Sequence, residues 1–440
     1  MDIAIKILQL IAALSLLVVV HEFGHFLFAK LFKCRVEKFY LFFDYKFAIF
    51  KKKIGQTEFG IGWIPFGGYV KISGMVDESM DKEQLAQKPQ PWEYRSKPAW
   101  QRFFIIIGGV MMNLVLACVI YICIAFAWGD SYVSTKDVHH GFAFSQVAQN
   151  MGFRNGDKIV SIDGQSVENF AKIPAEILLA ENRTVIVERD GQTITLKITD
   201  AQIKPMLKDR GFVQLRFPYV LGDVAPGMGA QQAGLMAGDS LLMADSIPMA
   251  YFDEYAAYFT QHKSDTVQLT FVRQGQTITA AVPLNEQGKM GAYLGGSGAI
   301  YPISTRQYNV IEAVPAGVQR GLDEVSNYLK QLKVIASPET GAYKEVGGFI
   351  AIGKIFPAAW SWFSFWNITA LLSIMLAVIN ILPIPALDGG HLVFILYEMI
   401  TRRAPSQKFM EAAQYVGFIL ILGLLIFANG NDIIKLFTGN

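Results

Sequence analysis

The chain has 440 residues, of which 52% are hydrophobic and only 17% are charged. This composition excludes an ordinary soluble protein and is typical of an integral membrane protein with room for more than one domain. The formal net charge of +2 gives no indication of a nucleic-acid or acidic partner, and the three cysteines, Cys34, Cys118 and Cys123, lack the spacing of a disulfide or zinc framework.

Four stretches are apolar and long enough to approach or exceed the roughly 20 residues that a membrane-spanning helix needs. They cover about 3–29, 103–128, 364–386 and 414–428, and the last one continues with a helical pattern. The sequence therefore predicts a polytopic α-helical membrane protein with four transmembrane helices.

The first apolar stretch contains an H-E-x-x-H motif, made by His21, Glu22 and His25. On a helix the two histidines lie one turn apart on the same face, which is the spacing with which two imidazoles bind zinc while the glutamate activates water. Ionisable residues inside a membrane helix are costly and usually functional. The alternative is a signal-peptide core ending at Val20, but no small-residue cleavage site follows and the apolar pattern resumes at Phe26.

Basic residues suggest how the chain lies across the membrane. Fourteen Lys or Arg residues fall between Lys30 and Arg102, and three more lie between the third and fourth spans. The positive-inside rule places both loops in the cytoplasm, so the termini and the segment from about 129 to 360 are expected in the periplasm of a bacterium. His21 then lies roughly 27 Å into a hydrocarbon layer of about 30 Å, near its cytoplasmic side.

The first cytoplasmic region, 34–102, begins with alternating aromatic and charged residues and continues with a glycine-rich run from Gly60 to Val70. These patterns predict a membrane-associated β-hairpin region that packs beside the active site, because irregular backbone at membrane depth needs protein or a watery cavity around it. We expect Gly67 and Gly68 to contact substrate, as part of an edge strand from Gly60 to Ile72. The alternative is a solvated hairpin at the interface, and residues 77–98 are expected to be a linker.

An internal repeat fills the long segment after the second span. Residues 152–159 recur at 234–241 with the pattern G-x-x-x-G-D, and residues 189–194 recur at 273–278. The repeat predicts two copies of a small β-rich α+β fold, and its turn and strand pattern resembles the PDZ domains of periplasmic proteases. PDZ folds bind extended peptides at a sheet edge, although such domains can also serve only as spacers.

After the repeat, apolar residues recur at steps of three and four, which predicts an amphipathic helix near 310–335 with a kink at Pro315. This helix would either cap the second copy or lie on the membrane surface.

A catalytic zinc usually has three protein ligands, so a third is expected at membrane depth. The third span ends in a run from Asn380 to His391 that is rich in proline and glycine and contains Asp388. Asp388 is the natural third ligand, and His391 is a weaker rival. A helix-ending aspartate at the interface is the alternative interpretation.

These residues together resemble the site-2 protease family of intramembrane zinc proteases. Its two signatures are H-E-x-x-H and N-x-x-P-x-x-x-x-D-G, and both match at every fixed position, the second from Asn380 to Gly389. The four-span plan, the G-G-Y-V-K stretch that begins at Gly67 and the tandem PDZ insert are similar to one branch of the family. The chain departs from that branch at Val110, where proline is usual, and at Gly347 to Phe349.

The resemblance implies zinc as cofactor, with His21, His25 and Asp388 as ligands and Glu22 as general base. It places Asn380 and Pro383 near the substrate. It also implies an endopeptidase of the bacterial inner membrane that cuts single-span proteins within or beside the membrane after another protease has trimmed them. Anti-sigma factors in an envelope-stress cascade and remnant signal peptides are the implied substrates.

Two other functions are weighed against this one. A membrane PDZ adaptor with a structural metal and no proteolysis would have no use for Glu22. A metal transporter needs polar residues in several spans, and the second and fourth offer few.

The expected organisation has nine parts. They are transmembrane helix 1 (1–33), the β region and linker (34–102), transmembrane helix 2 (103–128), the two PDZ domains (129–215 and 216–298), a connector with the amphipathic helix (299–362), transmembrane helix 3 (363–390), a cytoplasmic loop (391–413) and transmembrane helix 4 (414–436).

Overall fold

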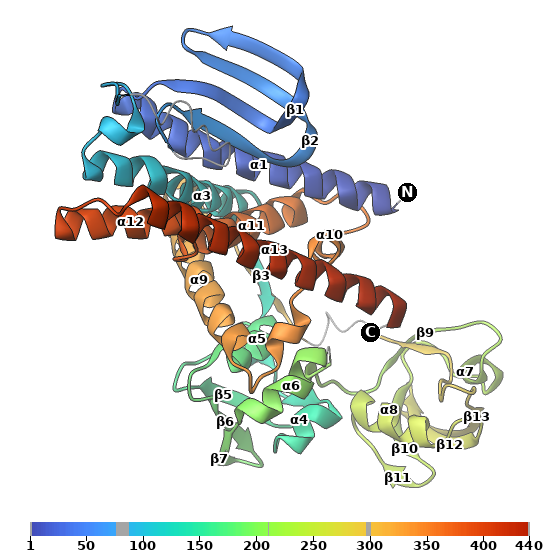
Figure 1. The fold of residues 1–440 in the computed structure, drawn as a ribbon. Coiled ribbons are helices and arrows are strands. Elements are labelled where there is room, and N and C mark those ends of the chain that lie inside the picture. The colour runs from blue at the N-terminus through green and yellow to red at the C-terminus, as the bar shows by residue number, and fades with distance from the viewer. Residues whose placement is uncertain (1, 76–87, 210, 296–300, 439–440) are drawn as a thin grey trace. The chain divides into compact units, whose positions relative to one another are not determined.

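The computed structural model describes residues 2–75, 88–209, 211–295 and 301–438. The chain forms two compact units (Figure 1). The first contains residues 1–129, 307–336 and 343–440, and the second contains 130–306 and 337–342. Half of the expected linker at 77–98, and the boundary at 298–299, lie outside the described residues.

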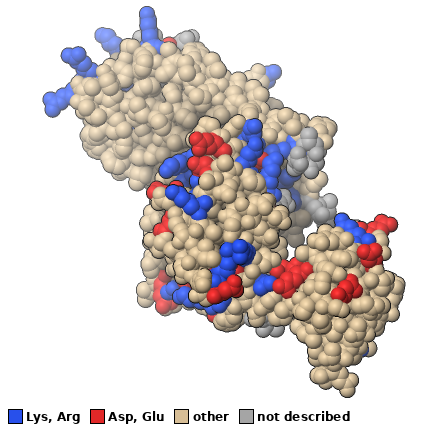
Figure 2. Space-filling model, turned by 90° about the horizontal axis from the view of Figure 1, so that it is seen from below, with Lys and Arg blue, Asp and Glu red and all other residues tan. Residues whose placement is uncertain are grey.

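The first unit is a helical bundle with one β-sheet. Its elements are α1 (Asp2–Leu31), β1 (Val36–Ile54), β2 (Thr57–Ile72), α3 (Ala99–Trp128), α9 (Val310–Ala336), α10 (Phe349–Ile355), α11 (Trp362–Ile381), α12 (Asp388–Thr401) and α13 (Gln407–Thr438). Four of these helices are long and apolar enough to cross a membrane, which confirms the predicted number of spans: α1, α3, α11 and α13. Figure 2 shows a broad surface almost without charged side chains, with Lys and Arg projecting from its margin.

The third span is shorter than expected. We predicted one element through 363–390, but α11 ends at Ile381 and Asp388 is the first residue of the separate helix α12. The prolines at 383 and 385 explain the break, because each lacks an N–H and disfavours helical backbone before it. Helix α12 also occupies much of the region expected to be a loop at 391–413.

Helix α3 lies at the centre of this unit, and α1, α9, α11 and α12 all pack against it. Small residues permit the closest of these contacts. A Cβ atom on Gly24 of α1 would lie only 2.2 Å from the carbonyl oxygen of Gly108, so the two backbones touch where these glycines meet. Close approach through small residues is a common way for membrane helices to associate.

The predicted β region is present, but it is more than a hairpin of short strands. Strands β1 and β2 have 19 and 16 residues, and each bends so that the two make four segments side by side. The segment 38–41 lies between 58–61 and 68–71, while 50–53 pairs with the other side of 58–61. Phe42 and Lys46, both at positive φ, lie in the bend of β1. The sheet lies along α1 (Figure 1).

The amphipathic helix near 310–335 is present as α9, and a position on the membrane surface stays a prediction. It packs against α3 and α11 of the first unit. Gly317 and Gly321, four residues apart, face α3, where a Cβ on Gly317 would lie 2.4 Å from the backbone nitrogen of Ile122. The opposite side of α9 leaves Ile311, Leu322 and other apolar side chains exposed.

The second unit contains the repeat as two small α/β cores. Its elements are β3 (Asp130–Val133), β4 (Phe142–Phe144), α4 (Gln146–Asn150), β5 (Lys158–Ile162), α5 (Ile173–Leu179), β6 (Thr184–Arg189), β7 (Gln192–Lys197), α6 (Asp200–Lys208), β8 (Val213–Leu215), β9 (Leu221–Val224), α7 (Gly229–Gln232), β10 (Ser240–Ala244), β11 (Ile247–Pro248), α8 (Phe252–Gln261), β12 (Thr266–Arg273), β13 (Gln276–Pro283), β14 (Ala292–Leu294) and β15 (Ile303–Arg306). The first copy has sheets β5–β6–β7 and β4–β8, and the second has β11–β10–β12–β13 and β9–β14.

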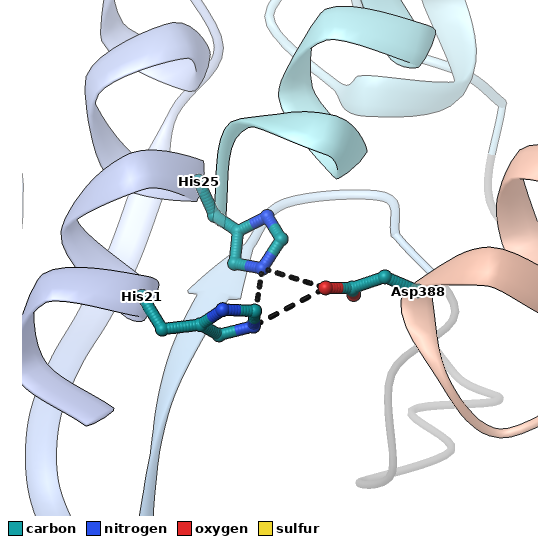
Figure 3. Close-up of side chains that lie close together, drawn as sticks. All are labelled: His21, His25 and Asp388. Atoms are coloured by element: carbon teal, nitrogen blue, oxygen red, sulfur yellow. Dashed lines mark hydrogen bonds and ion pairs between the residues drawn. The ribbon is translucent and has the colours of Figure 1, made fainter. Parts of the chain in front are cut away.

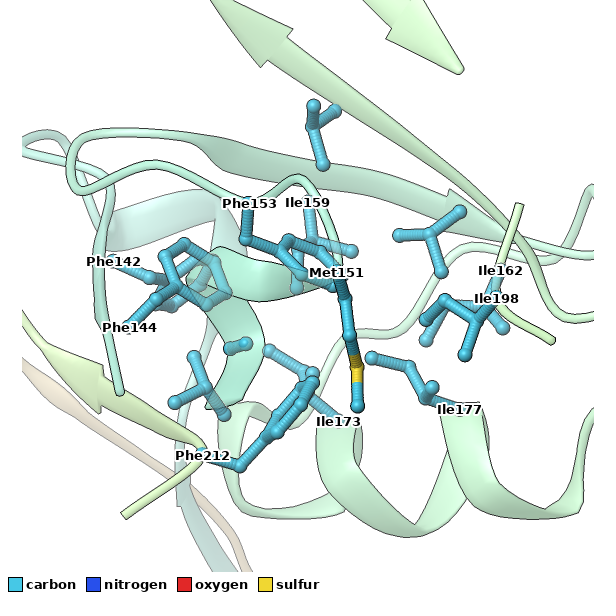
Figure 4. Close-up of a cluster of buried hydrophobic side chains, with 14 of the residues drawn as sticks. Phe142, Phe144, Met151, Phe153, Ile159, Ile162, Ile173, Ile177, Ile198 and Phe212 are labelled. Carbon is cyan, nitrogen blue, oxygen red and sulfur yellow. The ribbon is translucent and has the colours of Figure 1, made fainter. Parts of the chain in front are cut away.

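The core of the first copy is rich in phenylalanine and isoleucine (Figure 4). It also contains Tyr301, which follows the second copy in sequence. Strand β15, the last strand of the unit, pairs with β3, the first, with Arg306 opposite Asp130. The second copy is therefore inserted into the first, rather than following it as the expected boundary at 215 and 216 implied.

A shared ion pair accounts for the repeated sequence pattern. In the first copy the buried Asp157 accepts hydrogen bonds from Nε and Nη2 of Arg189, both at 2.7 Å. In the second copy Arg273 makes the same two contacts with the buried Asp239 at the same distances. Each pair ties the G-D turn to a β-hairpin, so the repeated aspartate, arginine and glycines are required together.

Candidate metal centre

Helix α1 presents His21 and His25 on one face, one turn apart, as the motif predicts (Figure 3). Both are buried, and their Nε2 atoms lie 3.2 Å apart. Two imidazoles with nitrogens this close need a shared cation or a shared proton between them.

Asp388 enters the site from the first turn of α12 (Figure 3). The loop from 382 to 387 folds tightly against the start of that helix. A Cβ on Gly389 would lie 2.0 Å from the carbonyl oxygen of Leu382, and Ala386 adopts a positive φ of 77°. Proline, glycine and this strained turn together bring the carboxylate to the histidines.

The three side chains have the geometry of a zinc site. Oδ2 of Asp388 lies 3.2 Å from Nε2 of His21 and 3.4 Å from Nε2 of His25. These atoms and the 3.2 Å separation of the imidazoles form a nearly equilateral triangle. Ligands of a tetrahedral zinc ion, each about 2.0–2.2 Å from the metal, are separated by about 3.3 Å. Oδ2 of Asp388 is also buried without a hydrogen-bond partner of good geometry among the described residues, which fits an atom reserved for a metal.

Helix α3 supplies the contacts that orient the imidazoles. Nδ1 of His25 donates to the carbonyl oxygen of Ile105 at 2.8 Å, so its Nε2 has a free lone pair for a metal. Nδ1 of His21 lies 3.3 Å from the side-chain nitrogen of Asn113. Gly109 makes room for both rings, since a Cβ there would lie 2.5 Å from Nε2 of His25.

The other predicted site residues lie at different distances from this triangle. Glu22 is half-buried on α1 next to His21, and the side-chain nitrogen of Asn380 lies 3.5 Å from Nε2 of His21. Pro383 is exposed in the loop after α11. His391 is outside the triangle, with its Nε2 3.2 Å from the side-chain nitrogen of Gln414, so the structure brings Asp388, and not His391, together with the two histidines.

Gly67 and Gly68 lie on β2 beside α1. Gly67 has a φ of 90°, and a Cβ on Gly68 would lie 2.7 Å from Cγ1 of Val18. Close packing thus requires glycine at 68, and the left-handed backbone favours it at 67. These roles are structural, and contact with substrate stays a prediction.

The sequence did not point to three groups on α3: the carbonyl of Ile105, Gly109 and the side chain of Asn113. Asn113 has no exposed surface although it lies in an apolar helix. A buried asparagine in a membrane span was the available signal, because such a polar side chain usually has a function.

Comparisons with known proteins agree with this geometry. Residues 9–424 match the model of peptidase family M50. A Neisseria meningitidis protein named as a zinc metalloprotease is 30% identical, with 98% of this chain and 99% of that protein covered. The regulator of sigma E protease of Haemophilus influenzae is 27% identical over 97% of this chain and 98% of its own length. The metalloprotease MmpA of Caulobacter vibrioides is also 27% identical, over 98% of this chain and 95% of its own length.

Proposed function

The chain belongs to peptidase family M50, the site-2 protease family of zinc metalloproteases, and from this premise we propose an endopeptidase that cuts single-span membrane proteins within or beside the bilayer. The observation that carries the proposal is the ligand triangle of His21, His25 and Asp388, which begins inside a candidate membrane span. The proposed location is the bacterial inner membrane.

In this proposal His21, His25 and Asp388 hold the zinc ion, and Ile105 and Asn113 fix the orientation of the two rings. Zinc supplies Lewis acidity, which acidifies water and polarises a peptide carbonyl. Glu22 acts as general base: it accepts a proton from the attacking water and delivers it to the leaving amine. The amide of Asn380, close to His21, is positioned to donate to the backbone of the substrate.

The adaptor function weighed from the sequence is set aside, because the chain belongs to a family of proteases and Glu22 is present beside the ligands. The direct test is purified protein incubated with a single-span substrate while bound zinc is measured in parallel. Glu22→Gln should retain zinc and lose cleavage, whereas His21→Ala and Asp388→Ala should lose both. Cleavage by the Glu22→Gln protein would contradict the assignment of the base.

The basic loops support a proposed orientation with the β1–β2 sheet and the loop after α12 in the cytoplasm. Both termini and the second unit are then periplasmic, and the zinc site lies near the cytoplasmic side. We propose that the two copies in the second unit are PDZ domains, supported by their repeated turns and β-hairpins.

A substrate helix must unwind before water can reach a carbonyl, and the proposed support for the unwound chain is an edge of the β1–β2 sheet. The predicted edge, from Gly60 to Ile72, needs correction. Ile61 pairs with Leu41 on one side and Phe50 on the other, so it is internal. The segment 68–72 pairs on one side only among the described residues, and it lies next to α1.

The proposed substrates are previously trimmed anti-sigma factors in an envelope-stress cascade, together with remnant signal peptides. The name of the Haemophilus relative, regulator of sigma E protease, supports a link to sigma-factor control.

A further inference from the structure

The β1–β2 sheet carries two contrasting exposed groups. One is an aromatic tip, made of five side chains that are each at least 44% exposed: Tyr45, Phe47, Ile49, Phe50 and Trp63. The other is a lysine row of three consecutive exposed residues on the outer segment of β1: Lys51, Lys52 and Lys53. Large apolar groups exposed together at this density indicate a surface that is covered by something apolar.

The strand register places the lysine row on the side of the sheet that faces the end of α1. Lys53 and Lys38 both pair with Glu58, and Lys38 lies near the start of β1, a few residues after α1 ends at Leu31. Exposed Lys30 and Lys33 lie at the same end of α1.

The aromatic tip lies at the opposite end of the sheet. Gly68 pairs with Leu41, just before the bend that leads into the tip, and packs against Val18. Val18 is roughly 20 Å along the helix from Leu31. The tip is therefore level with the interior of the apolar span, and the lysine row lies between the tip and the basic end of the helix.

Three acids of this sheet have contacts outside the lysine row. Asp44 pairs with Lys38 at 3.0 Å, and Glu37 pairs with Lys71 at 3.5 Å. Glu58 accepts a hydrogen bond from a tyrosine hydroxyl. Within the described part of the chain, the row forms no ion pair, so three exposed positive charges, on alternating faces of the strand, are available to an external partner.

We infer that the lysine row binds the headgroups of anionic phospholipids in the leaflet where α1 ends, while the aromatic tip lies among their acyl chains. Charge complementarity selects an anionic partner, and the tip at membrane depth selects a lipid over a soluble polyanion. Long lysine side chains reach the headgroups even from residues placed slightly deeper. Because the same sheet packs on α1 close to the histidines, bound anionic lipid holds the sheet against the metal site.

The test uses the full chain, purified in detergent, and titrates it with phosphatidylglycerol or phosphatidylcholine while bound lipid is counted by native mass spectrometry. The row variant is K51Q/K52Q/K53Q. The matched control, K172Q/K197Q/K263Q, removes the same charge from exposed lysines of the second unit. We expect the row variant to lose about a hundredfold in affinity for phosphatidylglycerol at low salt, with no change for phosphatidylcholine. The control should bind as the unchanged protein does.

Equal binding by the row variant and the unchanged protein, or an equal loss in the control, would overturn the inference. So would displacement of phosphatidylglycerol by inorganic phosphate, because that result would identify a general anion site. Zinc content, measured on each variant, reports whether the fold is intact.

The depth of the tip is tested separately in vesicles of phosphatidylcholine and phosphatidylglycerol. The fluorescence difference between the unchanged protein and Trp63→Phe isolates Trp63, and lipids with brominated acyl chains should quench it. An unquenched Trp63 would place the tip in water. Neither experiment needs a substrate, so a negative result leaves the proposed proteolysis untouched.

Discussion

The side-chain nitrogen of Asn113 lies 3.3 Å from Nδ1 of His21, although the two residues are 92 positions apart. In this arrangement the oxygen of the same amide, Oδ1, is buried without a hydrogen-bond partner among the described residues. A His21 that binds metal through Nε2 must carry its proton on Nδ1 and needs an acceptor there. Turning the Asn113 amide by 180° provides that acceptor and satisfies the orphaned oxygen, with no other change.

Asn113→Leu should therefore weaken zinc binding by about 10- to 100-fold, the usual effect of removing a group that orients a metal-bound histidine. Asn113→Asp retains an acceptor and should keep most of the affinity. The measurement is competition with a chelator on purified protein. Ser373→Ala is the packing control, since Ser373 donates to the backbone carbonyl of Asn113 and does not reach His21. Unchanged zinc affinity in Asn113→Leu would show that Asn113 does not orient the ring.

Much of the candidate metal site could be predicted from the sequence because its chemistry is local. The spacing of His21 and His25 fixes their common face on any helix, and Asp388 was the one acidic residue among the helix breakers after the third span. Asn113 and Gly109 were not identified, because their role depends on α3 passing close to α1. No periodicity in either helix specifies that contact, which Gly24 and Gly108 permit.

The fold was predictable to a similar extent. Apolar runs predicted the four spans, and the alternation of aromatic and charged residues predicted strands in the β region. The bends of β1 at Phe42 and Lys46 were not foreseen, since neither residue favours a positive φ. The helical pattern of α9 was clear, but its partner was not. The spacing of Gly317 and Gly321 was the overlooked signal for packing on another helix.

The free edge of β2 gives a prediction about substrate binding. Along such a strand, successive N–H groups point alternately into the ladder and outward. Proline at Tyr69 and proline at Val70, made separately, should therefore differ. One removes a donor to β1, and the other removes a donor from the open edge. Hydrogen exchange shows which of the two variants still has an intact sheet, and that variant should cleave substrate more slowly. If that variant cleaves at the normal rate, the substrate does not bind this edge.

The ion pair of Asp239 and Arg273 gives the second copy a dependence on pH. Burial raises the pKa of Asp239, but hydrogen bonds from Arg273 and the N–H of Met236 outweigh it and leave that pKa below its ordinary value. A carboxylate with a depressed pKa contributes stability above its unfolded pKa of about 3.9, and the contribution is lost as pH falls through the folded pKa. The second copy should hence lose protection from hydrogen exchange in acid.

Arg273→Gln should remove this contribution at neutral pH and lower the midpoint of unfolding of the second copy by at least about 5 °C. Hydrogen exchange of β12 and β13 in the whole protein is the measurement, and β6 and β7 of the first copy serve as the internal reference. Arg189→Gln should reverse the pattern, because Asp157 and Arg189 form the same pair in the first copy. Equal exchange in all four strands of both variants would show that the pairs are not stabilising.

The two copies of the second unit lie between β3 and β15, and the pairing of these strands shows how the copies can be removed. Strands β3 and β15 pair so that Asp130, at the start of this segment, lies opposite Arg306, at its end. Residues paired in an antiparallel ladder are about 5 Å apart, so a linker of about two glycines can replace 131–305 without displacing α3 or α9.

We expect this deletion variant to keep its zinc and to cut an untrimmed substrate that the whole protein does not cut. The physical reason is that a filter excludes bulky extracytoplasmic domains by volume alone and needs no peptide groove. A cleavage assay on trimmed and untrimmed forms of one substrate, with bound zinc as control, makes the comparison. Loss of cutting on both forms with zinc still bound would mean that the two copies deliver substrate, since only delivery requires them to be present.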